Sequence, residues 1–143
     1  MSKKLNSVLL IDDDEPTNFF NQMIVEESGC AEQIKTIQSG EEALEYLANI
    51  SSSGTTPPPD LIFLDINMPA MNGWEFLEKY KALQHNQKGK VMVVMLTTSL
   101  FPEDKHKAEE MPEVSGFENK PLTPEKLERI LKSYFDHENH EAA

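Results

Sequence analysis

The stretch that most constrains the fold runs from Leu61 to Gly73 and reads Leu-Ile-Phe-Leu-Asp-Ile-Asn-Met-Pro-Ala-Met-Asn-Gly. Its first four residues are all apolar, and a proline and a glycine follow soon after Asp65. An unbroken apolar run that is closed by turn residues is typical of a strand buried on both faces of a sheet. We therefore expect Asp65 at the end of a rigid strand, where water can reach its carboxylate.

A second acidic position follows the first apolar run of the chain, Ser7–Ile11, and reads Asp12-Asp13-Asp14-Glu15-Pro16. Adjacent aspartates repel one another, so holding them together has an electrostatic cost. Asp14 is the best candidate for a structural role, because its side chain can cap a helix in whose first turn Pro16 fits. In that helix Phe19, Phe20, Met23 and Ile24 recur at helical spacing up to a stop at Ser28-Gly29. Asp12 and Asp13 are left without a capping role.

The rest of the chain continues the alternation of apolar runs with helical patterns. Further strands are predicted at Ile34–Ile37, Val91–Leu96 and Gly116–Asn119. Further helices are predicted from Gly40 to about Ile50, from Gly73 to near Asn86–Gly89, from Pro102 to Glu110, and from Pro124, capped by Thr123, to about residue 135. The polar segment Ser51–Asp60 is predicted to be a mobile connection at the end of the third strand opposite Asp65, and the tail from Asp136 is predicted to fray.

Five strands that alternate with five helices predict one α/β domain over residues 1–143, with its core at about 5–135. Its parallel sheet should be covered by helices on both faces, with right-handed crossovers. In such sheets the reactive crevice lies at the carboxyl ends of the strands. The polar residues that follow the predicted strands are Asp12, Asp13, Asp65, Thr97 and Lys120. We therefore expect these side chains to meet in one crevice.

The charge balance limits the partners. The chain has 143 residues, of which 13 are basic and 25 acidic, so its net charge is -12. This balance argues against nucleic acid and against an anionic membrane surface, both of which bind basic faces. The single cysteine, Cys30, cannot form an internal disulfide, and no segment has the pattern of a signal peptide or of a membrane span. These features are typical of a cytoplasmic protein.

The acidic residues of the expected crevice predict a metal site. Three carboxylates that converge on one crevice need a cation if all are to stay charged. Ligands that are all oxygen atoms select a hard ion, and Mg2+ takes one or two carboxylates together with water and phosphate oxygens. Asp12, Asp13 and Asp65 supply such a set, and the backbone carbonyl of Asn67 can join it.

The same crevice can carry out phosphoryl transfer. Carboxylates form aspartyl-phosphates, and Asp65 is the natural nucleophile. Lys120 as a fixed positive charge and Thr97 as a hydroxyl donor would neutralise the oxygens of the transferring group. The four histidines, His85, His106, His137 and His140, fall on helix ends, on a polar helix or in the tail, so a hydrolase triad is not expected.

Four segments in this order resemble the receiver domain of two-component response regulators, over about residues 5–135. They are Val-Leu-Leu-Ile-Asp-Asp-Asp, Leu-Asp-Ile-Asn-Met-Pro-Ala-Met-Asn-Gly, Val-Met-Leu-Thr-Thr-Ser and Phe-Glu-Asn-Lys-Pro-Leu. The resemblance implies a flavodoxin-like, doubly wound fold with strand order 2-1-3-4-5. Because it covers nearly the whole chain, it also implies a stand-alone regulator, similar to the chemotaxis regulators, without an output domain.

The resemblance further implies a role for each residue that matches a family motif. Asp65 would accept a phosphoryl group from a phosphohistidine, with Mg2+ held by Asp12, Asp13 (the direct ligand of that pair), Asp65 and the carbonyl of Asn67. Thr97 would meet the phosphoryl group, Lys120 would pair with it, Phe117 would be the aromatic switch, and the bond before Pro121 would be cis. Two residues depart from the commoner pattern: Thr98 stands where Ala or Gly is usual, and Phe117 lacks the hydroxyl of the commoner Tyr.

The implied partners are a sensor histidine kinase or a histidine phosphotransfer protein, and a downstream target protein. The responding face would comprise the fourth helix, the fifth strand and the last helix, on a monomer or weak homodimer. Two other functions are open. A Mg2+-dependent phosphatase with an aspartyl-phosphate intermediate usually has a second acid at the place of Asn67, and an interaction module would not need its phosphorylation residues.

Overall fold

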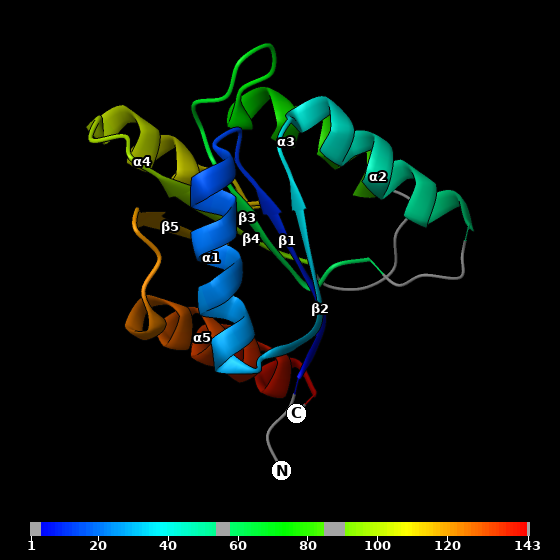
Figure 1. Cartoon of the computed structure of the whole chain (residues 1–143), viewed down its shortest axis with the longest axis vertical. Coiled ribbons are helices and arrows are strands. Elements are labelled where there is room, and N and C mark those ends of the chain that lie inside the picture. Colours follow the sequence, from blue (N-terminus) through cyan, green and yellow to red (C-terminus); the bar gives the residue numbers. More distant parts are fainter. Residues whose placement is uncertain (1–3, 54–57, 85–90, 143) are drawn as a thin grey trace.

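A parallel sheet flanked by helices forms the whole of the described structure, which is a computed structural model covering the backbone of residues 4–53, 58–84 and 91–142 (Figure 1). Its elements are β1 (Leu5–Ile11), α1 (Glu15–Ser28), β2 (Ala31–Ile37), α2 (Gly40–Ser53), β3 (Leu61–Leu64), α3 (Gly73–Gln84), β4 (Met92–Thr97), α4 (Pro102–Glu110), β5 (Gly116–Asn119) and α5 (Pro124–Ala142). The strands lie in the order β2-β1-β3-β4-β5, and every neighbouring pair is parallel. The predicted fold class and strand order are confirmed.

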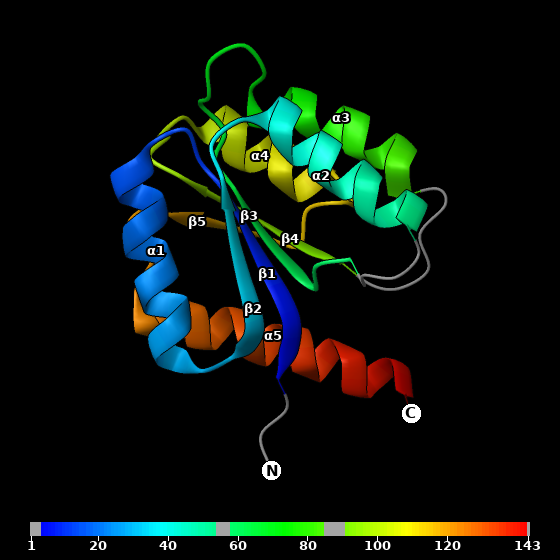
Figure 2. The ribbon, with the colours of Figure 1, turned by 45° about the vertical axis from the view of Figure 1, so that its right-hand side comes forward.

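The helices form one layer on each side of the sheet. Helices α1 and α5 lie on one side, and α2, α3 and α4 lie on the other (Figures 1 and 2). Successive side chains of a strand point to opposite faces, so a central strand must supply both layers. Along β1, Leu9 and Ile11 pack in the cluster under α2 and α3, whereas Val8 and Leu10 pack in the cluster under α1 and α5.

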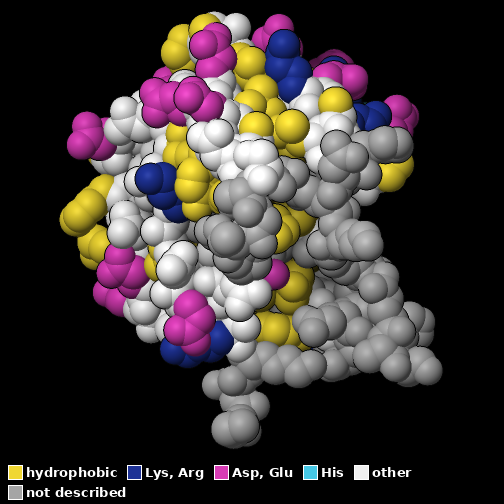
Figure 3. All heavy atoms as spheres, turned by 90° about the vertical axis from the view of Figure 1, so that its right-hand side faces the viewer, with side chains coloured by type: hydrophobic (Ala, Val, Ile, Leu, Met, Phe, Trp, Pro, Cys, Tyr) yellow, Lys and Arg dark blue, Asp and Glu magenta, His cyan; other side chains and the backbone are white. Residues whose placement is uncertain are grey.

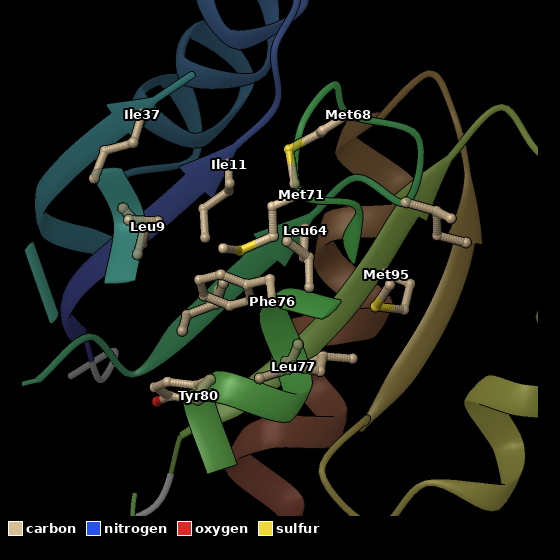
Figure 4. Packing of buried hydrophobic residues seen from close by; sticks show 14 of the residues in the cluster. Leu9, Ile11, Ile37, Leu64, Met68, Met71, Phe76, Leu77, Tyr80 and Met95 are labelled. Atoms are coloured by element: carbon tan, nitrogen blue, oxygen red, sulfur yellow. The ribbon is translucent and has the colours of Figure 1, made fainter. Parts of the chain in front are cut away.

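The central strands β3 and β4 are buried along their whole length, as their unbroken apolar sequences predict. Figure 4 shows Phe76, Leu77 and Tyr80 of α3 packed beside Leu64 and Met95 of these strands. Met68, Met71, Met92 and Met95 are all buried among apolar residues, and Cys30 is buried as well. Packing therefore accounts for these residues.

Helix α1 begins as predicted, and its most apolar side chains are not the ones that it buries. The Asp14 carboxylate accepts a hydrogen bond of 3.0 Å from the backbone N–H of Thr17, which confirms the cap. The apolar residues Phe19, Phe20 and Met23 do not form the core face of the helix, because their side chains are 66%, 44% and 40% exposed. The buried residues of α1 are Asn18, Asn21 and Val25. The apolar spacing that indicated this helix is confirmed, but it does not identify the residues that the helix buries.

Several elements are longer than the sequence pattern predicts. Strand β1 begins at Leu5, β2 begins at Ala31, α2 continues to Ser53, and α5 continues to Ala142 instead of ending near residue 135. The remainder of the predicted connection after α2 and the predicted end of α3 near Asn86–Gly89 lie partly or wholly outside the described residues. Asp60 enters β3 at its amino end, where its backbone N–H bonds to the carbonyl of Ser7 at 3.0 Å, so it lies opposite Asp65 as expected.

The surface agrees with the acidic composition. On the face shown in Figure 3, Asp and Glu side chains are scattered among polar and apolar ones, and Lys and Arg side chains appear in small separate groups. Within the described part of the chain, no helix is long and apolar enough to cross a membrane.

Candidate functional site

The acidic residues after β1 and β3 are brought together by the register of the sheet. Ile11 of β1 lies opposite Leu64 of β3, so Asp12 and Asp65 leave the sheet side by side. The backbone N–H of Asp65 bonds to the carbonyl of Ile11 at 3.0 Å, and that of Asp12 bonds to the carbonyl of Ile37 at 3.1 Å. One carboxylate oxygen from each of Asp12, Asp13 and Asp65 lies within 4.8 Å of the other two. Asp12 and Asp65 are buried, and Asp13 is exposed.

Lys120 completes this charged cluster from the end of β5. Its Nζ lies 2.5 Å from Asp12 Oδ2 and 3.5 Å from Asp65 Oδ1. The backbone N–H of Lys120 bonds to the carbonyl of Thr97 at 2.9 Å, which fixes the lysine beside the end of β4. The Lys120-Pro121 bond is cis, as the resemblance implies.

The surroundings of Asp65 raise the pKa of its carboxyl group. Burial and, next, the charge of Asp12 raise the pKa of this carboxyl to about 6, against the opposing effect of Lys120. A smaller contribution that also raises the pKa comes from Asp13. At pH 7 a carboxyl with this pKa is roughly nine-tenths ionised, so Asp65 is available as a nucleophile but is held in an unfavourable charged state.

The other predicted site residues lie around this cluster. Thr97 is fully buried at the end of β4, and its hydroxyl oxygen accepts a hydrogen bond of 3.1 Å from the backbone N–H of Ser99. Asn67 is exposed in the loop after Asp65, and Thr98 is exposed after Thr97. Phe117 of β5 is half-buried and packs against the cluster under α2, α3 and α4.

Asn18 supports the site from α1 and is not among the site residues predicted from the sequence. Its Nδ2 donates to the carbonyl of Asp12 at 2.8 Å and to that of Ile37 at 3.4 Å, so it ties the start of the acidic loop to β2. The side chain is buried, and its Oδ1 has no hydrogen-bond partner among the described residues. The available signal was the spacing of Asn18, Asn21 and Val25 along one side of the helix, which the more apolar neighbouring stripe obscured.

The loop between Asp65 and α3 is held in one conformation by its own residues. Asn72 Oδ1 accepts from the backbone N–H of Glu75 at 2.9 Å, and Glu75 Oε1 accepts from that of Asn72 at 3.0 Å, which makes a capping box. Gly73 donates its N–H to the carbonyl of Ile66 at 2.8 Å. A Cβ at position 73 would lie 2.5 Å from the backbone oxygen of Asp65, so the close approach requires glycine.

The substitution Gly73→Ala should therefore destabilise the protein by about 1–3 kcal/mol, because its Cβ would displace the backbone of Asp65 and Ile66. Urea unfolding checks this value. Gly116→Ala is the matched control, since its Cβ would meet only a Val94 methyl group at an ordinary 3.6 Å. Equal effects of the two substitutions would contradict the steric argument.

The donor set fits a divalent cation of the hard class. Each ligand that the cluster offers is a carboxylate oxygen. Three ionised carboxylates with one lysine leave two negative charges that this cluster does not balance. The raised pKa of Asp65 reflects its burial first and then the charge of Asp12. A bound dication would balance the two charges.

The comparisons with known proteins agree with this geometry. The family model described as "Response regulator receiver domain" matches residues 8–132. A solved two-component response regulator from Cytophaga hutchinsonii is 36% identical in sequence, with a TM-score of 0.85, and the match covers 94% of this chain and 99% of that one.

Two curated relatives that match nearly the whole of this chain differ greatly in length. The two-component response regulator ARR22 of Arabidopsis thaliana is 29% identical over 95% of this chain and 88% of its own length. The hybrid signal transduction histidine kinase L of Dictyostelium discoideum is 29% identical over 99% of this chain, which spans only 8% of that kinase. With the parallel sheet in the order 2-1-3-4-5 and the acidic cluster at its carboxyl edge, the matched model assigns the chain to the family of response regulator receiver domains.

Proposed function

We propose that this receiver domain accepts a phosphoryl group on Asp65 and uses it to change a protein-binding face. The observation that carries the proposal is the convergence of Asp12, Asp13, Asp65 and Lys120 at one edge of the sheet. The membership in the receiver family supports it.

The chemistry follows from the positions of these side chains. A carboxylate oxygen of Asp65 attacks the phosphorus of the donor, and an O–P bond forms while the P–N bond of a phosphohistidine breaks. The bonding electrons leave with the imidazole, which takes up a proton. Lys120 lies within 3.5 Å of Asp65 Oδ1 and can pair with a phosphoryl oxygen, and the hydroxyl of Thr97 can donate to another.

The proposed cofactor is Mg2+. Asp12, Asp13, Asp65 and the backbone carbonyl of Asn67 would hold it, with Asp13 as the exposed direct ligand. When bound, it would supply positive charge that offsets the charge developing on the phosphoryl oxygens.

The proposed donor of the phosphoryl group is a sensor histidine kinase or a histidine phosphotransfer protein. The proposed target is a downstream protein that binds the α4, β5 and α5 face. Phe117 on β5 is half-buried and can turn further inward when Thr97 moves. Phosphorylation of Asp65 would then change the shape of the α4, β5 and α5 face. A cytoplasmic location would give it access to such a donor.

The test is intact mass after incubation with acetyl phosphate and Mg2+, for the wild type and for Asp65→Asn. We expect one added phosphoryl group that depends on Mg2+ and is lost in the variant. Glu75→Gln, in the capping box of the loop after Asp65, is the control that should keep the addition. Modification of Asp65→Asn would exclude Asp65 as the acceptor, and no modification of the wild type would favour a fold kept for binding.

A further inference from the structure

The turn between β4 and α4 joins the proposed phosphoryl pocket to a second hydrogen-bonded group. The backbone N–H of Ser99 donates to Thr97 Oγ1 at 3.1 Å, and the Ser99 carbonyl accepts from Asn119 Nδ2 on β5 at 3.1 Å. The Ser99 side chain is buried, and its Oγ donates to Asp104 Oδ2 at 2.5 Å. One residue therefore links the hydroxyl of Thr97, strand β5 and helix α4.

Asp104 also forms a hydrogen bond with a residue of α3. Its other carboxylate oxygen, Oδ1, accepts a hydrogen bond of 3.3 Å from the indole Nε1 of Trp74. One turn further along α4, the Nζ of Lys107 lies 5.0 Å from the centre of the Trp74 ring, a cation–π distance. Trp74 and α4 are thus held together by two polar contacts.

Helix α4 has little else to hold its first turn. All residues of α4 are described, and of these only Ala108 is buried. Phe101, which precedes the helix, gives it no side-chain cap, and the side chains of Leu100 and Phe101 are 87% and 70% exposed. The side-chain contacts that fix the start of α4 are therefore the bonds of Asp104 to Ser99 and Trp74, together with the bond of 3.3 Å from the N–H of Phe101 to Ser99 Oγ.

We propose that Ser99, Asp104 and Trp74 form a relay that transmits the state of the phosphoryl pocket to the start of α4 and to α3. The relay deepens the proposed function and rests on it. If the hydroxyl of Thr97 turns toward a phosphoryl group on Asp65, its bond with the N–H of Ser99 changes. The buried hydroxyl of Ser99 donates to Asp104 and accepts from the backbone N–H of Phe101 at 3.3 Å. Losing the donated bond in a buried position is unfavourable, so Ser99 and Asp104 move as one unit and α4 moves with them. Ser99 and Asp104 act as positioning residues, not as groups that touch the phosphoryl oxygens.

Trp74 provides the readout, because it is the only tryptophan in the chain. The experiment records tryptophan emission of the full chain before and after addition of acetyl phosphate and Mg2+, with intact mass measured on the same samples. We expect the emission of the wild type to change on phosphorylation. Ser99→Ala keeps the Trp74–Asp104 bond, so it should keep the resting emission and the added phosphoryl group but lose the emission change.

Two further variants separate the hydrogen bonds of Asp104 from its charge. Asp104→Ala should change the resting emission and lose the emission change on phosphorylation. Asp104→Asn can still accept from Trp74 and bond to Ser99, so it should retain the emission change. Glu103→Gln is the matched control, an exposed acid in the same helical turn, and should behave as the wild type.

The outcomes for the relay and for the proposed function can be told apart. A wild type that gains the phosphoryl group without a change in emission overturns the relay, and so does a phosphorylated Ser99→Ala variant that responds as the wild type does. A wild type that gains no phosphoryl group by mass overturns the proposed function, and the relay falls with it.

Discussion

The substitution Asp65→Asn is expected to raise the free energy of unfolding by about 2–3 kcal/mol at pH 7 in the absence of divalent cations. The pKa of Asp65 is raised from 3.8 to about 6, chiefly by burial and by the charge of Asp12. Each unit of pKa difference between the folded and unfolded states corresponds to about 1.4 kcal/mol. An asparagine of the same size carries no charge, so it avoids the unfavourable ionisation in the folded protein.

The pH dependence of this gain has a definite sign. Below pH 3.8 Asp65 is protonated in both the folded and the unfolded state, and the substitution should have little effect. As the pH rises from about 4 to about 6, the unfolded chain loses its proton first, so the wild type loses stability relative to the variant. Above the folded pKa of about 6 the full difference is present.

Urea unfolding in EDTA at several pH values between about 4 and 8 measures the difference. Glu78→Gln, an exposed acid on α3, is the control and should show a small difference at every pH. A gain for Asp65→Asn that is as large at pH 4 as at pH 7 would show that packing, not charge, is its cause. Saturating Mg2+ should reduce the gain, because binding to the wild type alone stabilises its folded state.

The sequence predicted the fold and the acidic site well because both depend on local patterns. The unbroken runs Leu61–Leu64 and Val91–Leu96 correspond to the two central strands that are buried throughout. Since parallel strands end at one edge, residues that directly follow each run had to meet there. Asp12, Asp65 and Lys120 do meet, and the roles of all the predicted site residues in phosphorylation stay predictions.

Helix α1 shows where a local pattern misleads. Phe19, Phe20 and Met23 have the spacing of a core face, but the helix turns Asn18 toward the sheet. There Asn18 satisfies the backbone carbonyl of Asp12, which has left the regular sheet. This requirement arises only when β1, α1 and β2 are assembled, so hydrophobic periodicity alone cannot reveal it.

The group around Asp104 could not be predicted for a related reason. Trp74 and Asp104 are 30 residues apart, and Ser99 joins them only because the turn after β4 brings it to the start of α4. The sequence did indicate a polar helix at this position, and Ala108 is its buried residue. It did not indicate which polar side chains replace apolar packing.

The second large effect is expected from Lys120→Met, which should lower the free energy of unfolding by about 3 kcal/mol at pH 7 without divalent cations. The side chains of Lys120, Asp12 and Asp65 are only 14%, 4% and 6% exposed. Removing one partner of a buried ion pair leaves a buried charge without compensation, and such changes cost roughly 3–5 kcal/mol. The lower value is appropriate because Asp65 can take up a proton.

The cause can be tested by adding Asp12→Asn to the Lys120→Met variant and measuring urea unfolding. If charge imbalance is responsible, removing the carboxylate that lies 2.5 Å from Nζ should restore a large part of the lost stability. Lys79→Met, on the exposed face of α3, should change the stability by no more than about 0.5 kcal/mol. A double variant as unstable as Lys120→Met alone would mean that Lys120 contributes by packing of its methylene groups. Millimolar Mg2+ should also stabilise Lys120→Met, because a dication in the same cluster replaces the missing positive charge.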